Sequence, residues 1–242
     1  MKVEEKIAKI NFLKRVSLES FEVSIYVENF FNNIEVEVYN SAAIEGNRVS
    51  LGDTKKILEG DQLVDYTVAE QQEIINLAKA YELMYREYKG KALSTDMVLE
   101  LHRVIMKDRP YMAGAIRTVN VTASGHKSKK PIYSPFECVW VELCLMVESY
   151  YAKGYSPLER VSNLKCDFIQ THPFEDGNGR ESRLLLNFAL VSHGYIPITI
   201  RLEDRDNYIS VLERCREERD NKYFLEYICD IVLEEYKKLL TD

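Results

Sequence analysis

The sequence predicts a mainly α-helical protein with one short β-hairpin. Apolar residues recur at helical spacing through most of the 242 residues, and only 6 prolines and 10 glycines interrupt them. The exception is residues 114–133, where Val119 and Val121 alternate with polar neighbours ahead of a Ser-Gly-His turn, as in a hairpin. A lone hairpin is marginally stable in water. We therefore expect it to rest on the helices as a flap, the alternative being a plain surface loop.

The predicted helices follow the apolar periodicity from the N-terminus onward. Residues 1–16 are expected to form an amphipathic helix. Residues 134–137 (SPFE) and 156–159 (SPLE) each supply an N-cap serine, a proline at the first helical position and a glutamate at the third, which indicates a capping box. Gly194 suits the left-handed residue that ends a helix. The further helices are predicted at residues 20–45, 66–88, 95–107, 135–152, 157–171, 179–193, 205–218 and 221–240.

Charge and cysteine content narrow the class of protein. The net charge of −7 argues against nucleic-acid binding and against binding to anionic membranes. No run of roughly 20 apolar residues is present, and the N-terminus lacks a secretion signal, so we expect a cytoplasmic protein with no membrane partner. The cysteines are odd in number and not closely spaced, which favours reduced core thiols and no structural metal. They are Cys138, Cys144, Cys166, Cys215 and Cys229.

Residues 172–183, HPFEDGNGRESR, carry the strongest functional signal. Gly177 and Gly179 allow a tight turn whose N–H groups approach a ligand, and the helix that follows supplies further unpaired N–H donors. Asn178 adds a side-chain donor at the same place. Such a helix start is an anion site, which points to phosphate binding.

The charged residues of this segment extend the argument. Arg180 and Arg183 oppose the helix dipole, a cost that a bound polyphosphate would offset. Asp176 is a hard oxygen ligand suited to Mg²⁺ shared with phosphates. His172 is a candidate general base at neutral pH. Each residue taken alone also has an ordinary structural explanation. Together, however, they supply the groups that an enzyme needs to transfer part of a nucleoside triphosphate.

Residues 172–183 resemble the signature of the Fic family, HPFx[DE]GNGRxxR. Every specified position of that signature is matched by residues 172–183. The surrounding sequence is also similar, and the resemblance covers about residues 95–210. The flanking residues that carry it are Leu101, His102, Gly114 and Arg117 upstream, and Ile196, Pro197 and Tyr208 downstream.

The resemblance implies a Fic-type helical bundle with the hairpin as its flap. It divides the chain into an N-terminal helical region (1–94), a Fic core (95–210) and a C-terminal helical extension (211–242), which we expect to pack as one globular unit. The implied activity is adenylylation (AMPylation) of a Ser, Thr or Tyr hydroxyl on a target protein and on the chain itself. The implied co-substrate is ATP with Mg²⁺.

The implied roles fall on the motif residues. His172 would deprotonate the hydroxyl that attacks the α-phosphorus, and Asp176 would hold Mg²⁺. The remaining motif residues, Gly177, Asn178, Gly179, Arg180 and Arg183, would bind the phosphates. The glycine at position 179 favours AMP transfer, since relatives with lysine there act as kinases.

A second resemblance lies in residues 41–47, SAAIEGN. Ser41 and Glu45 are four residues apart and share a helix face, and Gly46 is a natural helix stop. The segment is similar to the Fic inhibitory motif, [ST]xxxE[GN], so an inhibitory helix is expected at about residues 36–47. Glu45 would pair with Arg183 and misplace the phosphates of ATP for in-line attack.

Several alternatives remain open at this stage. In one alternative, Glu45 aligns a water that removes AMP from targets, which would make the chain a deAMPylase. The same residues suit a transferase that uses another nucleotide donor, and a non-catalytic nucleotide-binding interaction module is a third class. A homodimer is possible.

Overall fold

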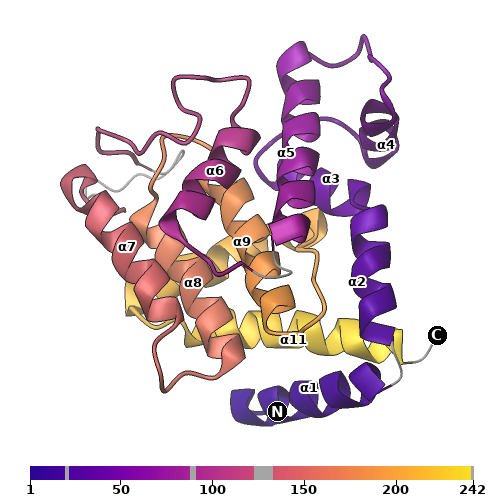
Figure 1. The fold of residues 1–242 in the computed structure, drawn as a ribbon, viewed down its shortest axis with the longest axis vertical. Helices are drawn as coiled ribbons and strands as arrows, with labels where there is room; N and C mark the ends of the chain where they lie inside the picture. The colour runs from indigo at the N-terminus through magenta and orange to yellow at the C-terminus, as the bar shows by residue number, and fades with distance from the viewer. Residues whose placement is uncertain (20–21, 88–90, 123–132, 241–242) are drawn as a thin grey trace.

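The computed structural model describes residues 1–19, 22–87, 91–122 and 133–240 (Figure 1). Within these ranges the chain forms eleven α-helices, two short 3₁₀ turns (Phe136–Cys138 and Leu202–Asp204) and no strand, which confirms the mainly α class. None of the described helices is long and apolar enough to cross a membrane. The helices are α1 (Val3–Glu19), α2 (Glu22–Asn32), α3 (Glu35–Ile44), α4 (Leu51–Glu59), α5 (Val68–Glu87), α6 (Thr95–Ile105), α7 (Val139–Tyr150), α8 (Pro157–Thr171), α9 (Asn178–Ser192), α10 (Arg205–Glu218) and α11 (Lys222–Leu239).

Helix α9 lies at the centre of the bundle. It contacts α8, α5, α6 and α3, and α7 packs on the outer side of α8 (Figure 1). From Asn178 to Val191 every residue except the half-buried Gly179 is buried. A helix buried on all sides belongs to the core. Its polar first turn must therefore find partners inside the protein, and those partners build the functional site.

The first and last helices of the described chain pack on each other. Helix α1 packs along α11 (Figure 1). The buried ammonium of Lys6 on α1 lies 3.3 Å from Glu226 and 2.7 Å from Asp230 of α11.

The structure differs from the predicted helices in three places. The predicted helix 20–45 is two helices, because the chain turns at Asn33, whose side-chain amide donates to the carbonyl of Asn29 (2.8 Å). Helix α4 was not predicted, although Ser50 caps its start (3.2 Å to the N–H of Asp53) and the left-handed Gly60 ends it.

The third difference is the start of the predicted helix 135–152. The capping box at residues 134–137 is wrong, because the Ser134 hydroxyl bonds Glu142 and leaves a 3₁₀ turn before α7. The box at residues 156–159 is confirmed at the start of α8. Gly194, with φ +72°, follows the end of α9 as expected.

The predicted hairpin lies partly outside the described residues, which exclude 123–132. Residues 114–122 form turns and irregular chain without a strand. Their backbone and side-chain groups bond the helical body instead: the N–H of Arg117 donates to the carbonyl of Pro173 (3.0 Å), and the Asn120 side chain accepts from the N–H of Phe136 (3.0 Å).

Candidate active site

His172 ends helix α8 in a left-handed conformation. Its φ of 48° is unusual for a residue other than glycine, and its N–H donates to the carbonyl of Phe168 (2.9 Å). The imidazole stacks on Tyr133, with ring centroids 3.8 Å apart. This backbone turn directs the ring out of the helix and into the cleft described below.

The buried guanidinium of Arg117 holds this turn in place. It donates to the carbonyls of His172 (2.7 Å) and Thr171 (3.2 Å) at the end of α8. It also donates to those of Val119 (2.9 Å), within the expected flap, and Ser134, just after it. Hydrogen bonds from a charged donor are stronger than neutral ones. Arg117 therefore ties the His172 backbone to the base of the flap segment.

His172 is neutral over the physiological range. Burial lowers its pKa to about 4, and the charge of Arg117 adds to that effect. The backbone of Ile169 and the carboxylates of Glu45 and Asp176 oppose it. The Nδ1 atom is buried and forms no hydrogen bond. A neutral imidazole is the form that can accept a proton.

The loop between α8 and α9 is held by its own side chains. The Asn178 amide bonds both backbone groups of Phe174, accepting from its N–H (3.0 Å) and donating to its carbonyl (2.8 Å). Gly177 has φ +83° and begins α9. The Asn178 side chain thus shapes the loop, and its expected contact with phosphate stays a prediction.

A second histidine supports the same loop from α6. The fully buried His102 stacks on Phe174, with centroids 3.5 Å apart. Its Nδ1 accepts from the N–H of Gly114 (3.0 Å), so Nε2 is assigned the proton and donates to the carbonyl of Asp176 (3.0 Å). His102 therefore connects the flap base to the motif loop.

Asp176 lies at the edge of the cleft between two arginines. Its carboxylate accepts from Arg109 (2.6 Å), Arg180 (2.9 Å) and the N–H of Gly177 (2.6 Å). Burial raises the pKa of Asp176, but Arg180, Gly177 and Arg109 lower it more, so it is ionised. The described residues contain no cluster of three metal ligands. A single half-buried carboxylate fits an ion that takes its other ligands from phosphates and water.

Arg183 is paired with the end of α3. It is 2% exposed, and its Nη2 lies 2.9 Å from Oε1 of Glu45. Its Nε donates to the Ser41 hydroxyl (2.9 Å) and Nη2 to the Ser41 carbonyl (2.7 Å). Although burial opposes both ionised forms, the mutual attraction lowers the pKa of Glu45 and raises that of Arg183. Arg180 is paired in a similar way, with Glu73 (3.0 Å) and Asp176.

Helix α3 is itself firmly anchored. The Tyr81 hydroxyl of α5 donates to the buried Glu37 (2.5 Å), and the Asn40 side chain accepts from the N–H of Leu202 (2.8 Å). At the other end, the Arg205 guanidinium of α10 donates to the Ile44 carbonyl (2.9 Å). Glu45 therefore projects from a helix that three other parts of the chain hold.

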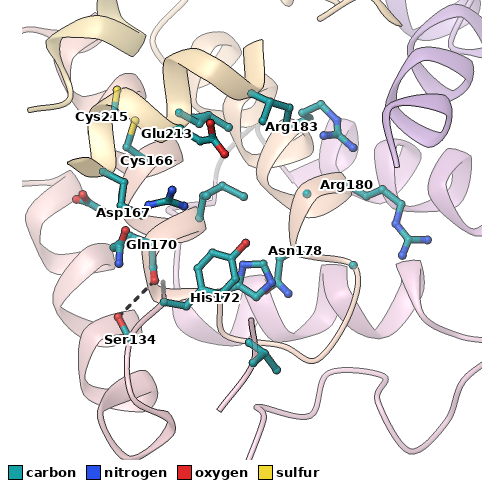
Figure 2. Close-up of a pocket in the computed structure, with 18 of the residues that line it drawn as sticks. Ser134, Cys166, Asp167, Gln170, His172, Asn178, Arg180, Arg183, Glu213 and Cys215 are labelled. Carbon is teal, nitrogen blue, oxygen red and sulfur yellow. Dashed lines mark hydrogen bonds between the residues drawn. The ribbon is translucent and has the colours of Figure 1, made fainter. Parts of the chain in front are cut away.

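These residues border one cleft of about 1370 Å³. His172 faces the start of α9, and the cleft continues between α8 and α10 (Figure 2). The predicted residues His172, Asp176, Gly177, Asn178, Gly179, Arg180, Arg183 and Glu45 all line it. Ser41 is buried behind Arg183, and Gly46 ends α3 with φ +98°.

Sequence reasoning missed several contributors to the site. Arg109, Glu73 and Tyr133 lie in helices and loops far from the motif, and each gains its role only through a tertiary contact. No local pattern marks them. The sequence indicated His102 and Arg117 only indirectly, because both belong to the stretch upstream of the flap that resembles the family.

Comparison with known proteins agrees with the motif. Residues 92–190 match the model of the Fic/DOC family. Protein adenylyltransferase fic-1 of Caenorhabditis elegans is 33% identical over 180 residues, which cover 72% of this chain and 35% of the relative. Protein adenylyltransferase Fic of Aedes aegypti is 31% identical over 202 residues, which cover 80% of this chain and 39% of the relative. The chain thus spans well under half of these relatives.

The fold agrees as well. The solved structure of Fic-1 (residues 134–508) from C. elegans superposes with a TM-score of 0.85 at 27% identity, covering 99% of this chain and 72% of the other. The signature at residues 172–183 lies in the same helix-loop-helix that forms the floor of the cleft. The chain therefore belongs to the Fic/DOC family.

Proposed function

We propose that the chain transfers AMP from Mg-ATP to a Ser, Thr or Tyr hydroxyl of a target protein and of itself, under restraint by Glu45. The names of its relatives, protein adenylyltransferases, support the reaction type. The observation that carries the proposal is the placement of a neutral imidazole beside a glycine-bent helix start that is rich in arginine.

The reaction follows from this arrangement. The His172 imidazole accepts the proton of the incoming hydroxyl, whose oxygen bonds the α-phosphorus of ATP. The bond from the α-phosphorus to the bridging oxygen breaks, and pyrophosphate leaves. The N–H group of Gly179, with the positive end of α9, stabilises charge on the phosphates. Arg183, once free of Glu45, binds the terminal phosphates.

Mg²⁺ fits the same site. Asp176 is ionised at the cleft edge, and it would hold the ion together with phosphate oxygens. When bound, the ion supplies neutralisation of the charge that develops on the phosphates. Arg109 and Arg180 keep the Asp176 carboxylate oriented before the nucleotide arrives.

We propose that the Glu45–Arg183 pair is a brake. Glu45 binds the Arg183 guanidinium that would otherwise hold the terminal phosphate, and its carboxylate adds a negative charge beside that phosphate. A misplacement of about 1 Å at the reacting atoms can cost on the order of 100-fold in rate. The expected result is a low basal activity that rises when the carboxylate is removed.

Intact mass after incubation with Mg-ATP tests the proposal. The Glu45→Gly chain should gain the mass of AMP, and the parent chain much less. Glu45→Gly combined with His172→Ala should gain none, while circular dichroism and unfolding show whether that variant is folded. Equal incorporation by Glu45→Gly and the parent would dismiss the brake, and incorporation by the folded double variant would dismiss the base.

A hydrolytic reverse activity is the second candidate. The Glu45 carboxylate lies inside the cleft and is ionised, so it can orient a water toward a bound AMP ester. The parent chain, incubated with AMP-modified Glu45→Gly chain and Mg²⁺ but no ATP, should then release AMP. Retention of the label across a series of Mg²⁺ and Mn²⁺ concentrations would remove this candidate. A panel of labelled nucleotides in the same assay identifies the preferred donor.

A further inference from the structure

Two cysteines face each other across the inner part of the cleft. Cys166 on α8 and Cys215 on α10 both line it, although their exposed fractions are only 7% and 4%. Each thiol shifts the pKa of the other, and Figure 2 shows the two sulfur atoms side by side. Helices α8 and α10 are in contact, so the pair bridges two elements that are distant in the sequence.

The surroundings of Cys215 favour its thiolate. The backbone N–H of Phe224, in the first turn of α11, lowers the pKa of the Cys215 thiol. A helix N-terminus stabilises negative charge. Lys165 lies nearby as a fully buried residue whose ammonium has no hydrogen-bond partner and sits 5.0 Å from the centre of the Tyr208 ring. Positive neighbours and helix N-termini are the features that make a cysteine reactive.

The two thiols are therefore unequal. The neighbouring Cys166, the Phe224 N–H and Lys165 lower the pKa of Cys215, in spite of its burial and the charge of Asp220, which raise it. The neighbouring Cys215 and burial raise the pKa of Cys166. One low-pKa thiol beside a second, protonated thiol is the arrangement of a reactive and a resolving cysteine.

We propose that Cys166 and Cys215 are an oxidant-sensitive dithiol, which a hydroperoxide converts into a disulfide that joins α8 to α10 in the wall of the cleft. The Cys215 thiolate attacks one peroxide oxygen, the O–O bond breaks, and a sulfenic acid forms with release of water or an alcohol. The Cys166 thiol then displaces the sulfenic hydroxyl as water. Two thiols lose two protons and two electrons, and the peroxide is reduced by the same two electrons.

The other three cysteines provide an internal comparison. Cys138 is exposed and Cys144 is half-buried on α7, outside the residues that line the cleft. Cys229 is buried on α11, where burial raises its pKa to about 12. Cys138 lies at the N-cap of α7 but makes no side-chain capping bond there, and none of the three lies beside a second thiol in the cleft wall, so we expect Cys166 and Cys215 to be the pair that forms a disulfide.

The disulfide should weaken nucleotide binding, a consequence that rests on the function proposed above. The two sulfur atoms must close to about 2.0 Å, which pulls α10 against α8. Asp167 and Gln170 on α8 and Glu213 on α10 flank the pair in the same wall (Figure 2). By linkage, a bound nucleotide should in turn slow formation of the disulfide.

Thiol mapping tests the dithiol without any reference to nucleotide. The reduced chain is treated with one equivalent of hydrogen peroxide, alkylated with N-ethylmaleimide under denaturing conditions, and analysed by intact and peptide mass. Two of the five thiols should disappear, with a Cys166–Cys215 cross-linked peptide that dithiothreitol removes. Cys229→Ser should form the same cross-link, and Cys166→Ser should yield a Cys215 sulfenic acid that dimedone traps.

Different results contradict the dithiol, its coupling to the cleft and the proposed function. A chain that keeps all five thiols, or whose Cys138 oxidises as fast as Cys215, overturns the inference. ATP affinity is then measured before and after oxidation, and a loss of about tenfold or more is expected. Unchanged affinity in the cross-linked chain overturns the coupling to the cleft. Absence of ATP binding by the reduced chain contradicts the proposed function and leaves the cross-link result standing by itself.

Discussion

The carboxylate of Glu45 lies against the α-carbon of Gly179. A methyl group added to Gly179 would overlap Oε1 of Glu45 and sit 2.7 Å from its carboxyl carbon. The residue expected to bind phosphate and the residue expected to inhibit therefore occupy neighbouring space, and the absence of a side chain at position 179 is what allows the Glu45–Arg183 pair to form.

Gly179→Ala should destabilise the chain by about 1–3 kcal/mol through this overlap. In the Glu45→Gly background the same change should cost less, because the overlapping atoms are gone, with a coupling of about 1 kcal/mol or more. Urea unfolding of the four forms measures the coupling. Gly52→Ala in α4 is the matched control, since a methyl group there meets nothing within 4 Å. Additive costs at positions 45 and 179 would contradict the contact.

Ser41→Ala should release the brake in part. The change removes the hydroxyl that accepts from Nε of Arg183 but leaves the Ser41 carbonyl and Glu45 in place. Self-modification should rise above that of the parent chain but stay below that of Glu45→Gly. The unfolding free energy should fall by about 1–3 kcal/mol, because a buried donor loses its acceptor. Ser149→Ala, which removes a hydroxyl bonded within α7, should change neither quantity appreciably.

The pH dependence of catalysis should lack the inflection of an ordinary histidine. Burial lowers the pKa of His172 to about 4, so the imidazole is already deprotonated well below neutral pH. The kcat/KM of Glu45→Gly for ATP should therefore be nearly flat between about pH 5.5 and 8 and fall only toward more acidic pH. A half-maximal rate near the usual histidine pKa of about 6.5 would show that the base is a solvated imidazole.

His102 should make the fold sensitive to acid. Burial lowers its pKa to about 4, below its value of 6.5 in an unfolded chain. Between these two values the unfolded state binds more protons than the folded state, so stability falls as the pH drops through this window. The contribution lost is on the order of 3 kcal/mol once the pH is below both values. His102→Gln should reduce the slope of unfolding free energy against pH between 6.5 and 4, even if the variant is less stable at neutral pH.

The positions of the motif helix and its neighbours could be predicted from the sequence more fully than the contacts between them. The pattern HPFEDGNGRESR located the anion-binding helix start because backbone turns and helix dipoles are local properties. The pairing of Glu45 with Arg183 was also expected, but only through the resemblance to an inhibitory motif. Composition and spacing alone left Glu45 as a residue at a helix end.

Contacts between distant segments were not visible in the sequence. Arg109 is an ordinary charged residue until the fold places it 2.6 Å from Asp176. The Ser134 prediction failed for a similar reason, since a good N-cap residue found a competing partner in Glu142. Cys166 and Cys215 were classed as separate core thiols because nothing local indicated that α10 returns to α8.

The anchoring of α3 bears on how often the parent chain becomes active on its own. Because Tyr81, Leu202 and Arg205 hold the helix, the least costly excursion is rotation of the Glu45 side chain, with the backbone left in place. A rotated state present one per cent of the time lies about 2.7 kcal/mol above the paired one. The turnover rate of the parent chain, divided by that of Glu45→Gly, would then equal the fraction of molecules with the Glu45 side chain rotated away. A partner that stabilised the rotated side chain could raise the population without unfolding any helix.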